Sequence, residues 1–283
     1  MKVTKYWHRE TQAAQDREGS SYALIGWGGS SRSIEEARQR ARDKLQRMID
    51  TLGRGEDLHE YEYHNGELRE ELIEQITDNR GTLIAAVTRN RYGALVLNAA
   101  NVLIADIDLP NTVSIGGLLG SIFGRKKKGP SPRDTVIDSL HRIASQHPAW
   151  RLHVYDTHSG LRVFETSRPY DPTSNDSQDM LAALNSDTLY RSLCRTQQCY
   201  RARLTPKPWR CNSQRPPNTF PRESKADQRE FDQWLSAYND TARRYTVCRL
   251  NTTIGNGIMT DEAMQVMAVH DSYALNDNAD QIA

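Results

Sequence analysis

The stretch Leu103-Ile104-Ala105-Asp106-Ile107-Asp108-Leu109-Pro110 is apolar up to two aspartates that stand one residue apart, and it stops at a proline. Side chains alternate between the two faces of a strand, so Asp106 and Asp108 are expected on one face. Pro110 cannot donate to a ladder, which predicts that the strand ends there, at the rim of a sheet. Two carboxylates on one face suit a hard cation such as Mg²⁺ or Mn²⁺. The alternative is that Asp is simply common where a strand meets a turn.

The segments that follow this strand predict a ferredoxin-like (RRM-like) core. A helix is expected at 133–146, a strand pair at 150–157 and 161–166, a helical region at 177–198, and a strand at 200–204. Together these make the order βαββαβ. In such a sheet the turn of the strand pair lies beside the end of the first strand. The polar groups expected near the two aspartates are therefore Asp156, His158, Ser159 and Arg162.

These elements resemble the palm of the archaeo-eukaryotic primase superfamily, over about residues 94–208. The resemblance rests on the apolar run that leads into Asp106-Ile107-Asp108, and on the later turn Thr157-His158-Ser159-Gly160 that enters another strand. It implies that Asp106 and Asp108 bind catalytic metal ions. In that family a Ser-x-His element contacts the triphosphate of the incoming nucleotide. No histidine follows Ser159 here, so Arg162 or His158 would take that role, and no third acidic residue of the family pattern is evident.

Basic and aromatic residues are dense between 195 and 210, and five of them are candidates for phosphate or base contacts, together with Ser159 of the predicted turn. Arginine forks suit phosphate oxygens, and a tryptophan can stack on a base. The alternative is a solvated sheet face with a buried tryptophan. The segment Arg201–Cys211 is also similar to a group of uncharacterised bacterial proteins. The candidates for nucleotide or nucleic-acid binding are Ser159, Arg201, Arg203, Lys207, Trp209 and Arg210.

All four cysteines stand in the last third of the chain, at Cys194, Cys199, Cys211 and Cys248. A tetrahedral zinc site usually takes its ligands from two close pairs. Cys194 and Cys199 form one such pair, whereas Cys211 and Cys248 are far apart in sequence. Two interpretations are therefore kept, a zinc site and free cysteines that pack in the core as small apolar residues.

The rest of the chain divides into an N-terminal α/β unit (1–92), the palm-like core (93–210) and a helical C-terminal appendage (211–283). In the first unit we expect strands near 2–7 and 22–27 and a helix opened by the capping box Ser33-Ile34-Glu35-Glu36. A second helix is expected over 68–76, followed by a strand at 83–87. Within the core, residues 111–132 are expected to form a flexible loop, because 116–130 combine glycines with the basic run Arg125–Lys128. That loop is either a solvated insertion or a contact for a membrane surface or partner.

Composition sets limits on function. The chain has 283 residues, a formal net charge of +1 and 26% charged residues, so no global field selects nucleic acid or membrane. It has no apolar run long enough for a membrane span, and its first residues do not read as a signal peptide, so a cytoplasmic location is expected. The motifs favour a metal-dependent nucleotidyl- or phosphoryl-transfer protein. The alternatives are a non-catalytic nucleotide- or nucleic-acid-binding module and a protein-interaction scaffold; protein partners are not indicated.

Overall fold

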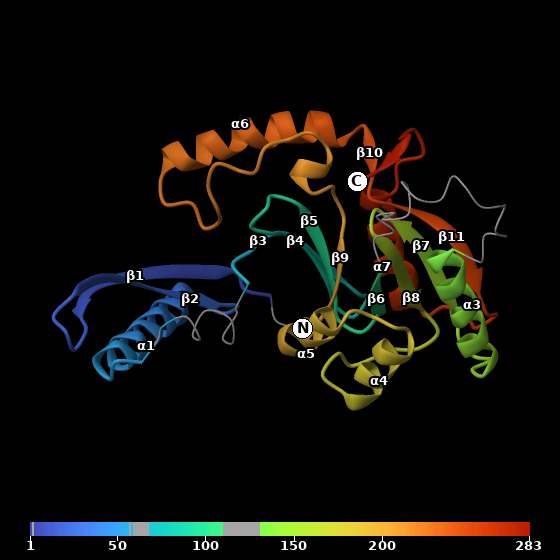
Figure 1. Cartoon of the computed structure of the whole chain (residues 1–283), viewed down its shortest axis with the longest axis horizontal. Coiled ribbons are helices and arrows are strands. Elements are labelled where there is room, and N and C mark those ends of the chain that lie inside the picture. Colours follow the sequence, from blue (N-terminus) through green and yellow to red (C-terminus); the bar gives the residue numbers. More distant parts are fainter. Residues whose placement is uncertain (2, 57, 59–67, 110–130) are drawn as a thin grey trace, which may run out of the picture.

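The protein is a mixed α+β molecule whose described residues form three antiparallel sheets and one short parallel strand pair, combined with helices (Figure 1). The structure is a computed structural model, and it describes residues 1, 3–56, 58, 68–109 and 131–283. The glycine-rich basic loop at 116–130 and Pro110 therefore lie outside the described residues. The six α-helices of the described ranges begin at residues with strong capping preference, among them Ser33, Ser131, Ser224 and Thr260.

The first three elements form an arm. Strands β1 (Tyr6–Gln15) and β2 (Ser21–Ser30) pair in an antiparallel hairpin, and α1 (Ile34–Gly53) packs on it. β2 extends the strand predicted near 22–27 at both ends, whereas β1 overlaps the strand predicted near 2–7 only at residues 6 and 7. Leu24, Leu45 and Leu52 form a small core of their own, and Figure 1 shows this unit projecting from the rest of the molecule.

One predicted helix is wrong, because residues 71–77 form strand β3 (Glu71–Thr77). The connection to β4 (Leu83–Arg89) explains the difference. Asp78 accepts hydrogen bonds from the backbone of Arg80 and Thr82 at 2.9 and 2.8 Å, and Gly81 has φ +80°. An aspartate that caps the turn and a glycine with positive φ are typical of a β-hairpin, so the segment before the turn pairs with β4 as a strand.

Two four-stranded sheets make up the body of the molecule. One has the order β3-β4-β5-β9, with β5 at Leu95–Ala99 and β9 at Tyr200–Arg203. The other has the order β11-β7-β8-β6, with β6 at Leu103–Asp108, β7 at Leu152–Thr157, β8 at Gly160–Glu165 and β11 at Cys248–Ile254. Three predicted core strands therefore pair in the order expected for the βαββαβ arrangement, β6-β8-β7, while β9 is hydrogen-bonded to β5.

A tyrosine lies between β6 and β9 in place of a backbone ladder. The Tyr190 hydroxyl is 2.7 Å from the carbonyl oxygen of Ile104 and 3.0 Å from that of Arg201, and it accepts the Arg201 N–H at 3.1 Å. Because one side-chain oxygen bonds both strands, the two sheets approach edge to edge at this point. This contact positions β9 beside the end of β6.

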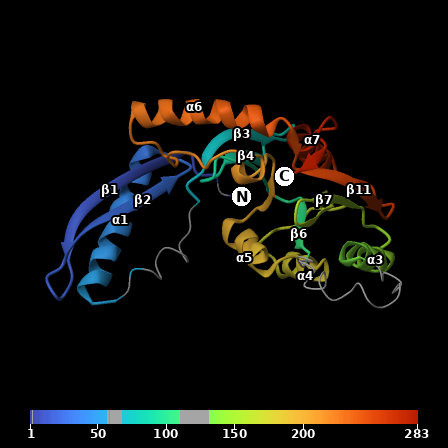
Figure 2. The same ribbon diagram turned by 45° about the horizontal axis from the view of Figure 1, so that its top comes forward.

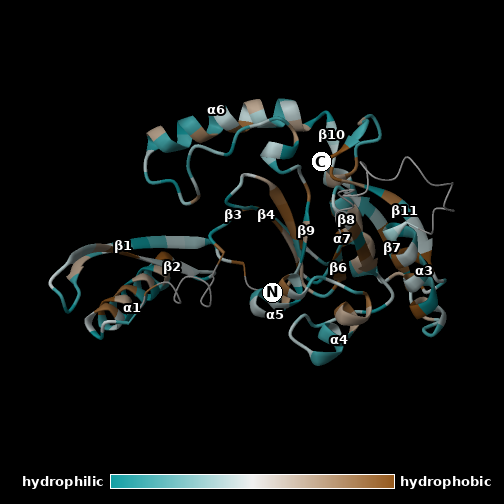
Figure 3. Ribbon diagram, viewed as in Figure 1, coloured by the Kyte–Doolittle hydropathy of each residue, from teal (hydrophilic) through white to brown (hydrophobic). Residues whose placement is uncertain are grey.

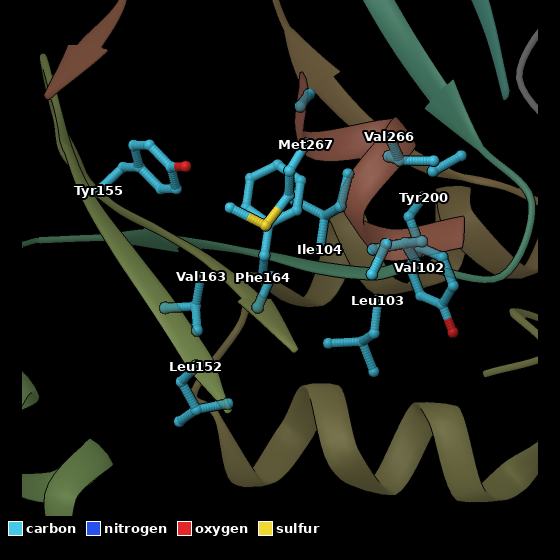
Figure 4. Packing of buried hydrophobic residues seen from close by; sticks show 14 of the residues in the cluster. Val102, Leu103, Ile104, Leu152, Tyr155, Val163, Phe164, Tyr200, Val266 and Met267 are labelled. Atoms are coloured by element: carbon cyan, nitrogen blue, oxygen red, sulfur yellow. The ribbon is translucent and has the colours of Figure 1, made fainter. Parts of the chain in front are cut away.

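The helices cover both faces of the β6-β8-β7-β11 sheet. They are α3 (Pro132–Ser145), α4 (Asn175–Ala183), α5 (Thr188–Gln197) and α7 (Asp261–Ala274). Figure 4 shows Met267 of α7 beside Phe164, while Leu103 and Leu152 point to the opposite side of the sheet. The apolar strands at the centre and the polar outer helices are visible in Figure 3.

The sheets cross the boundaries that the sequence predicted. β3 and β4 come from the predicted N-terminal unit but share a sheet with β5 and β9, through the pairing of β4 with β5, and β11 comes from the predicted helical appendage but pairs with β7. Residues 211–283 also contain the short parallel pair β10 (Tyr245–Thr246) and β12 (Gln281–Ile282). Helix α6 (Lys225–Ala242) runs over the first body sheet, as Figures 1 and 2 show, and its Trp234 ring leaves no room for a Cβ at Gly93.

Candidate functional site

A pocket of about 150 Å³ lies at the end of β6, where β9 and the β7–β8 turn approach it. We call it the aspartate pocket. It unites residues from β6, from the turn, from β9 and from the short 3₁₀ helix η1 (Pro208–Arg210). Its lining comprises Asp106, Asp108, Thr157, His158, Ser159, Arg162, Arg203, Lys207, Arg210, Val247 and Ala283. All the predicted catalytic and binding residues except Arg201 and Trp209 are thus brought to one place.

The strand register places the two aspartates beside the hairpin. Asp106 is directly opposite Arg162 and Asp108 is directly opposite Gly160 in the antiparallel β6–β8 ladder, so these side chains share a face. Gly160 permits the approach, because a Cβ there would stand 1.9 Å from the Ile107 carbonyl oxygen. Asp156 points to the other face, where it forms an ion pair with Arg133 of α3.

The loop between α4 and α5 fixes the backbone of Asp106. The Ser186 hydroxyl accepts the Asp106 N–H at 3.3 Å and donates to the Asp106 carbonyl oxygen at 3.0 Å. The Asp187 N–H donates to the same carbonyl at 3.0 Å. The backbone N–H and carbonyl groups of Asp106 on the outer edge of β6 are therefore hydrogen-bonded, and the Asp106 carboxylate projects from a rigid backbone.

The two carboxylates have no ion-pair partner among the residues that the structure describes. Among the described residues, neither Asp106 nor Asp108 has a cationic nitrogen within 4 Å of its carboxylate or a hydrogen bond to it. Burial raises the pKa of Asp108, and the negative charges of Asp106 and Asp187 raise it further, while Lys207 and Arg210 act in the opposite direction. Two free carboxylates side by side at a pocket rim fit the oxygen ligands that Mg²⁺ or Mn²⁺ prefers.

Four cationic side chains, Arg162, Arg203, Lys207 and Arg210, line the same pocket. Burial, with the charges of Arg162 and Arg210, lowers the pKa of Arg203 to about 10. Burial also lowers the pKa of Lys207, and the nearby positive charges of Arg203 and Arg210 lower it further. In the described part of the chain no carboxylate lies within 4 Å of any of the four. Gathering like charges in this way costs free energy, which a bound polyanion offsets.

Arg162 is held from behind by α7. It is 4% exposed, and its Nη1 donates to the Arg203 carbonyl at 2.9 Å and to His270 Nε2 at 3.0 Å. His270 Nδ1 lies 2.8 Å from an oxygen of Asp271, which also accepts the Tyr155 hydroxyl at 2.9 Å. Because an arginine only donates, Nε2 of His270 must accept and Nδ1 must carry the proton.

This arrangement makes stability depend on pH. Burial lowers the pKa of His270 to about 4, against 6.5 ordinarily, although Asp271 favours the charged form and Arg162 opposes it. The unfolded chain therefore takes up a proton at a higher pH than the folded one, so this contribution is complete above pH 6.5 and is lost as the pH falls toward 4. We expect roughly 2 to 3 kcal/mol to disappear between pH 7 and 4.5. Urea unfolding at both pH values, compared with His270→Gln, measures it; an equal loss in the variant would contradict the assignment.

Arg201 does not line the pocket. Its Nη2 donates to both carboxylate oxygens of Glu70, at 2.7 and 2.9 Å, and Glu70 also accepts the Thr88 hydroxyl at 2.6 Å. Trp209 is 44% exposed just outside the pocket, with its ring edge-on to Tyr92 at a centroid distance of 5.2 Å. The guanidinium of Arg201 is thus part of a buried ion pair, and Trp209 is accessible to a ligand.

Cys194 and Cys199 lie near each other, whereas Cys211 and Cys248 belong to other parts of the fold. All are buried and free: Cys194 and Cys199 flank the end of α5, Cys211 follows η1, and Cys248 on β11 lies 3.8 Å from His270 Nε2. Within the described ranges, no group of three or more His, Cys, Asp or Glu side chains is arranged to hold a metal. Burial raises the pKa of Cys194 to about 12 and of Cys248 to about 11, so these thiols stay protonated at neutral pH.

Several residues of the site were not anticipated from the sequence. Ser186-Asp187-Thr188 carries a recognisable helix start, since the Asp187 side chain caps α5 by accepting the Tyr190 N–H at 2.8 Å. His270 and Asp271 gave no local signal, because their role depends on α7 packing against β8. Tyr155 and Tyr190 read only as apolar strand and helix positions.

No family model, no curated protein and no solved structure matches this chain. The resemblance to the primase palm therefore remains a prediction from the sequence motifs quoted above. Among the described helices, none is both long and apolar enough to cross a membrane.

Proposed function

We propose that the aspartate pocket binds a divalent cation together with the phosphate groups of a nucleotide, and that the protein is a metal-dependent nucleotidyl- or phosphoryl-transfer protein with a primase-like palm. The observation that carries this proposal is the composition of the pocket. Two carboxylates and four cations, none of them ion-paired to another described residue, line a pocket of about 150 Å³, which is room for phosphate groups and an ion.

The donor set fits magnesium or manganese. Mg²⁺ keeps several waters and is commonly bound by one or two carboxylates plus substrate phosphates, which agrees with the two aspartates here. A bound metal would polarise a phosphoryl oxygen and neutralise charge. The chain's own groups would do the rest: Arg162, Arg203 and Lys207 bind phosphate oxygens, and the Arg210 Nη2, which donates to the Ser159 hydroxyl at 2.9 Å, closes the rim. The strand order β6-β8-β7, with β9 beside β6, supports the palm.

A substitution of Arg203 tests whether the cationic side chains of the pocket bind phosphate. Because burial and like charges already lower its pKa, Arg203→Gln should leave the melting temperature of the free protein equal to or above that of the wild type. It should weaken pyrophosphate binding by about 10-fold or more, since charge-assisted bonds are lost. Isothermal titration calorimetry gives the affinity and a thermal scan the stability.

Arg244→Gln is the matched control, because Arg244 is exposed and lies outside the pocket. It should leave pyrophosphate affinity unchanged. If Arg203→Gln and the wild type bind pyrophosphate with equal affinity, Arg203 does not bind phosphate and this part of the proposal is wrong.

A second candidate is a non-catalytic module for single-stranded nucleic acid, and the surface beside the pocket favours it. The Arg215 guanidinium lies 5.1 Å from the Trp209 ring centre, and that of Arg91 lies 4.8 Å from the Tyr92 ring centre. Lys207, which lines the pocket, lies 5.6 Å from the Trp209 ring. Positive charge therefore continues from the pocket along an aromatic pair, the pattern by which strands are held through backbone and bases.

The two candidates respond differently to salt and mutation. If the surface binds a strand, Arg91→Gln/Arg215→Gln should weaken binding of a labelled oligonucleotide and reduce the slope of log K against log salt by roughly 1 to 2. Fluorescence anisotropy measures both, with Arg243→Gln/Arg244→Gln as the control of equal charge. An unchanged slope would exclude this surface as the strand path.

A further inference from the structure

The strand residue Arg162 reaches into the aspartate pocket, yet what fixes its direction comes from α7, some 108 residues further along the chain. Side chains that face Arg162 come from each neighbouring element. Asp106 is its partner on β6, Tyr155 its partner on β7, and His270 packs against it from α7. His270 has no exposed surface and stands edge-on to Phe164 and Tyr155, at ring distances of 4.8 and 5.1 Å.

We propose that His270 and Asp271 are positioning residues of the aspartate pocket: Asp271 holds His270 in one tautomer, and His270 together with the Arg203 carbonyl holds Arg162 so that its remaining N–H groups face the ligand phosphate. This inference rests on the proposed function and adds to it a part of the site that lies behind the pocket wall.

The hydrogen-bond directions leave one consistent arrangement. Nη1 of Arg162 gives its bonds to the Arg203 carbonyl and to Nε2 of His270, both acceptors. Nδ1–H of His270 then donates to Asp271, whose oxygens also receive the Tyr155 hydroxyl. A fully buried histidine costs free energy unless both ring nitrogens are satisfied, and here each has a partner. Because Nη1 of Arg162 donates two hydrogen bonds, the guanidinium can rotate little. Less conformational entropy is therefore lost when a phosphate binds to it.

The test is a double-mutant cycle on the full chain, read by calorimetric titration of pyrophosphate in the presence of Mn²⁺. His270→Leu keeps the apolar packing but removes the acceptor, and we expect affinity to fall by about 10-fold, the scale on which lost outer-shell partners act. In His270→Gln the amide oxygen can accept from Arg162, so affinity should return to within about 3-fold of wild type. In the Arg162→Gln background, adding His270→Leu should change affinity no further, because His270 acts through Arg162.

Val266→Ala is the control for helix packing, since Val266 is a fully buried residue of the same α7 whose apolar side chain forms no hydrogen bond to Arg162. It should lower the melting temperature and leave affinity unchanged. A loss of affinity in Val266→Ala equal to that in His270→Leu, or additive losses in the double variant, would overturn the positioning role. If wild type binds pyrophosphate and His270→Leu binds it equally well, this inference fails alone. If wild type binds no pyrophosphate at all, the proposed function fails and the inference fails with it.

Discussion

The variant Asp106→Asn/Asp108→Asn is expected to lose the stabilisation that Mn²⁺ adds at a fixed concentration of nucleoside triphosphate, while it binds metal-free pyrophosphate more tightly than the wild type does. The two effects have opposite signs for one physical reason. The wild-type pocket has four positive and two negative side chains. The substitutions remove both metal ligands and both charges that repel a phosphate.

The size of the first effect follows from mass action. A ligand present at 100 times its Kd stabilises the native state by about 2.7 kcal/mol, which in a chain of this size corresponds to several degrees in melting temperature. Thermal scans with and without Mn²⁺, at fixed triphosphate, measure it. The exposed pair Asp232→Asn/Asp240→Asn carries the same change of charge on α6 and should respond to Mn²⁺ as the wild type does.

The outcomes separate the candidate functions. A double variant with the full wild-type response to Mn²⁺ would exclude these aspartates as metal ligands. A wild type that binds pyrophosphate without regard to Mn²⁺, and more tightly after the substitutions, would favour the non-catalytic module, because the carboxylates would then act only by repulsion.

Glu70→Ala is expected to be the most destabilising change outside the apolar core, by about 3 kcal/mol. Glu70 is 8% exposed and binds Arg201 through both carboxylate oxygens, so its removal leaves a buried guanidinium without its counter-ion. The Thr88 hydroxyl loses its acceptor as well, and Thr88 in turn accepts from Asn98 at 2.9 Å. Urea unfolding gives the free energy of unfolding.

Two comparisons make this prediction specific. Glu70→Ala/Arg201→Met should recover much of the lost stability, because the uncompensated charge is gone. Asp240→Asn, which breaks an exposed pair with Arg243, should change the free energy of unfolding by no more than about 1 kcal/mol. If Glu70→Ala costs as little as Asp240→Asn, Arg201 is solvated and available to a ligand, contrary to the structure.

Local sequence rules predicted most elements but failed where a partner strand decided the outcome. The capping box at Ser33 marked one helix and periodic apolar residues marked the helix expected at 133–146, and the structure confirms both. The apolar residues of 71–77 are compatible with the periodicity of a helix or of a strand, and the pairing with β4 made them a strand. The same limit applies to β11, whose place beside β7 depends on a pairing about 90 residues distant in sequence.

The sequence by itself determined the local part of the site: the run that ends in Asp106 and Asp108, the turn with Ser159 and Gly160, and the basic residues near 203–210. These are properties of adjacent residues, because alternation and turn chemistry act over a few positions. Tertiary structure alone decided that Arg203 faces the pocket while Arg201 pairs with Glu70. It also decided that His270 stands behind Arg162. These arrangements depend on which groups from distant elements pack beside a buried charge. The free energy of the resulting ion pairs and hydrogen bonds is set by tertiary packing rather than by neighbours in the chain.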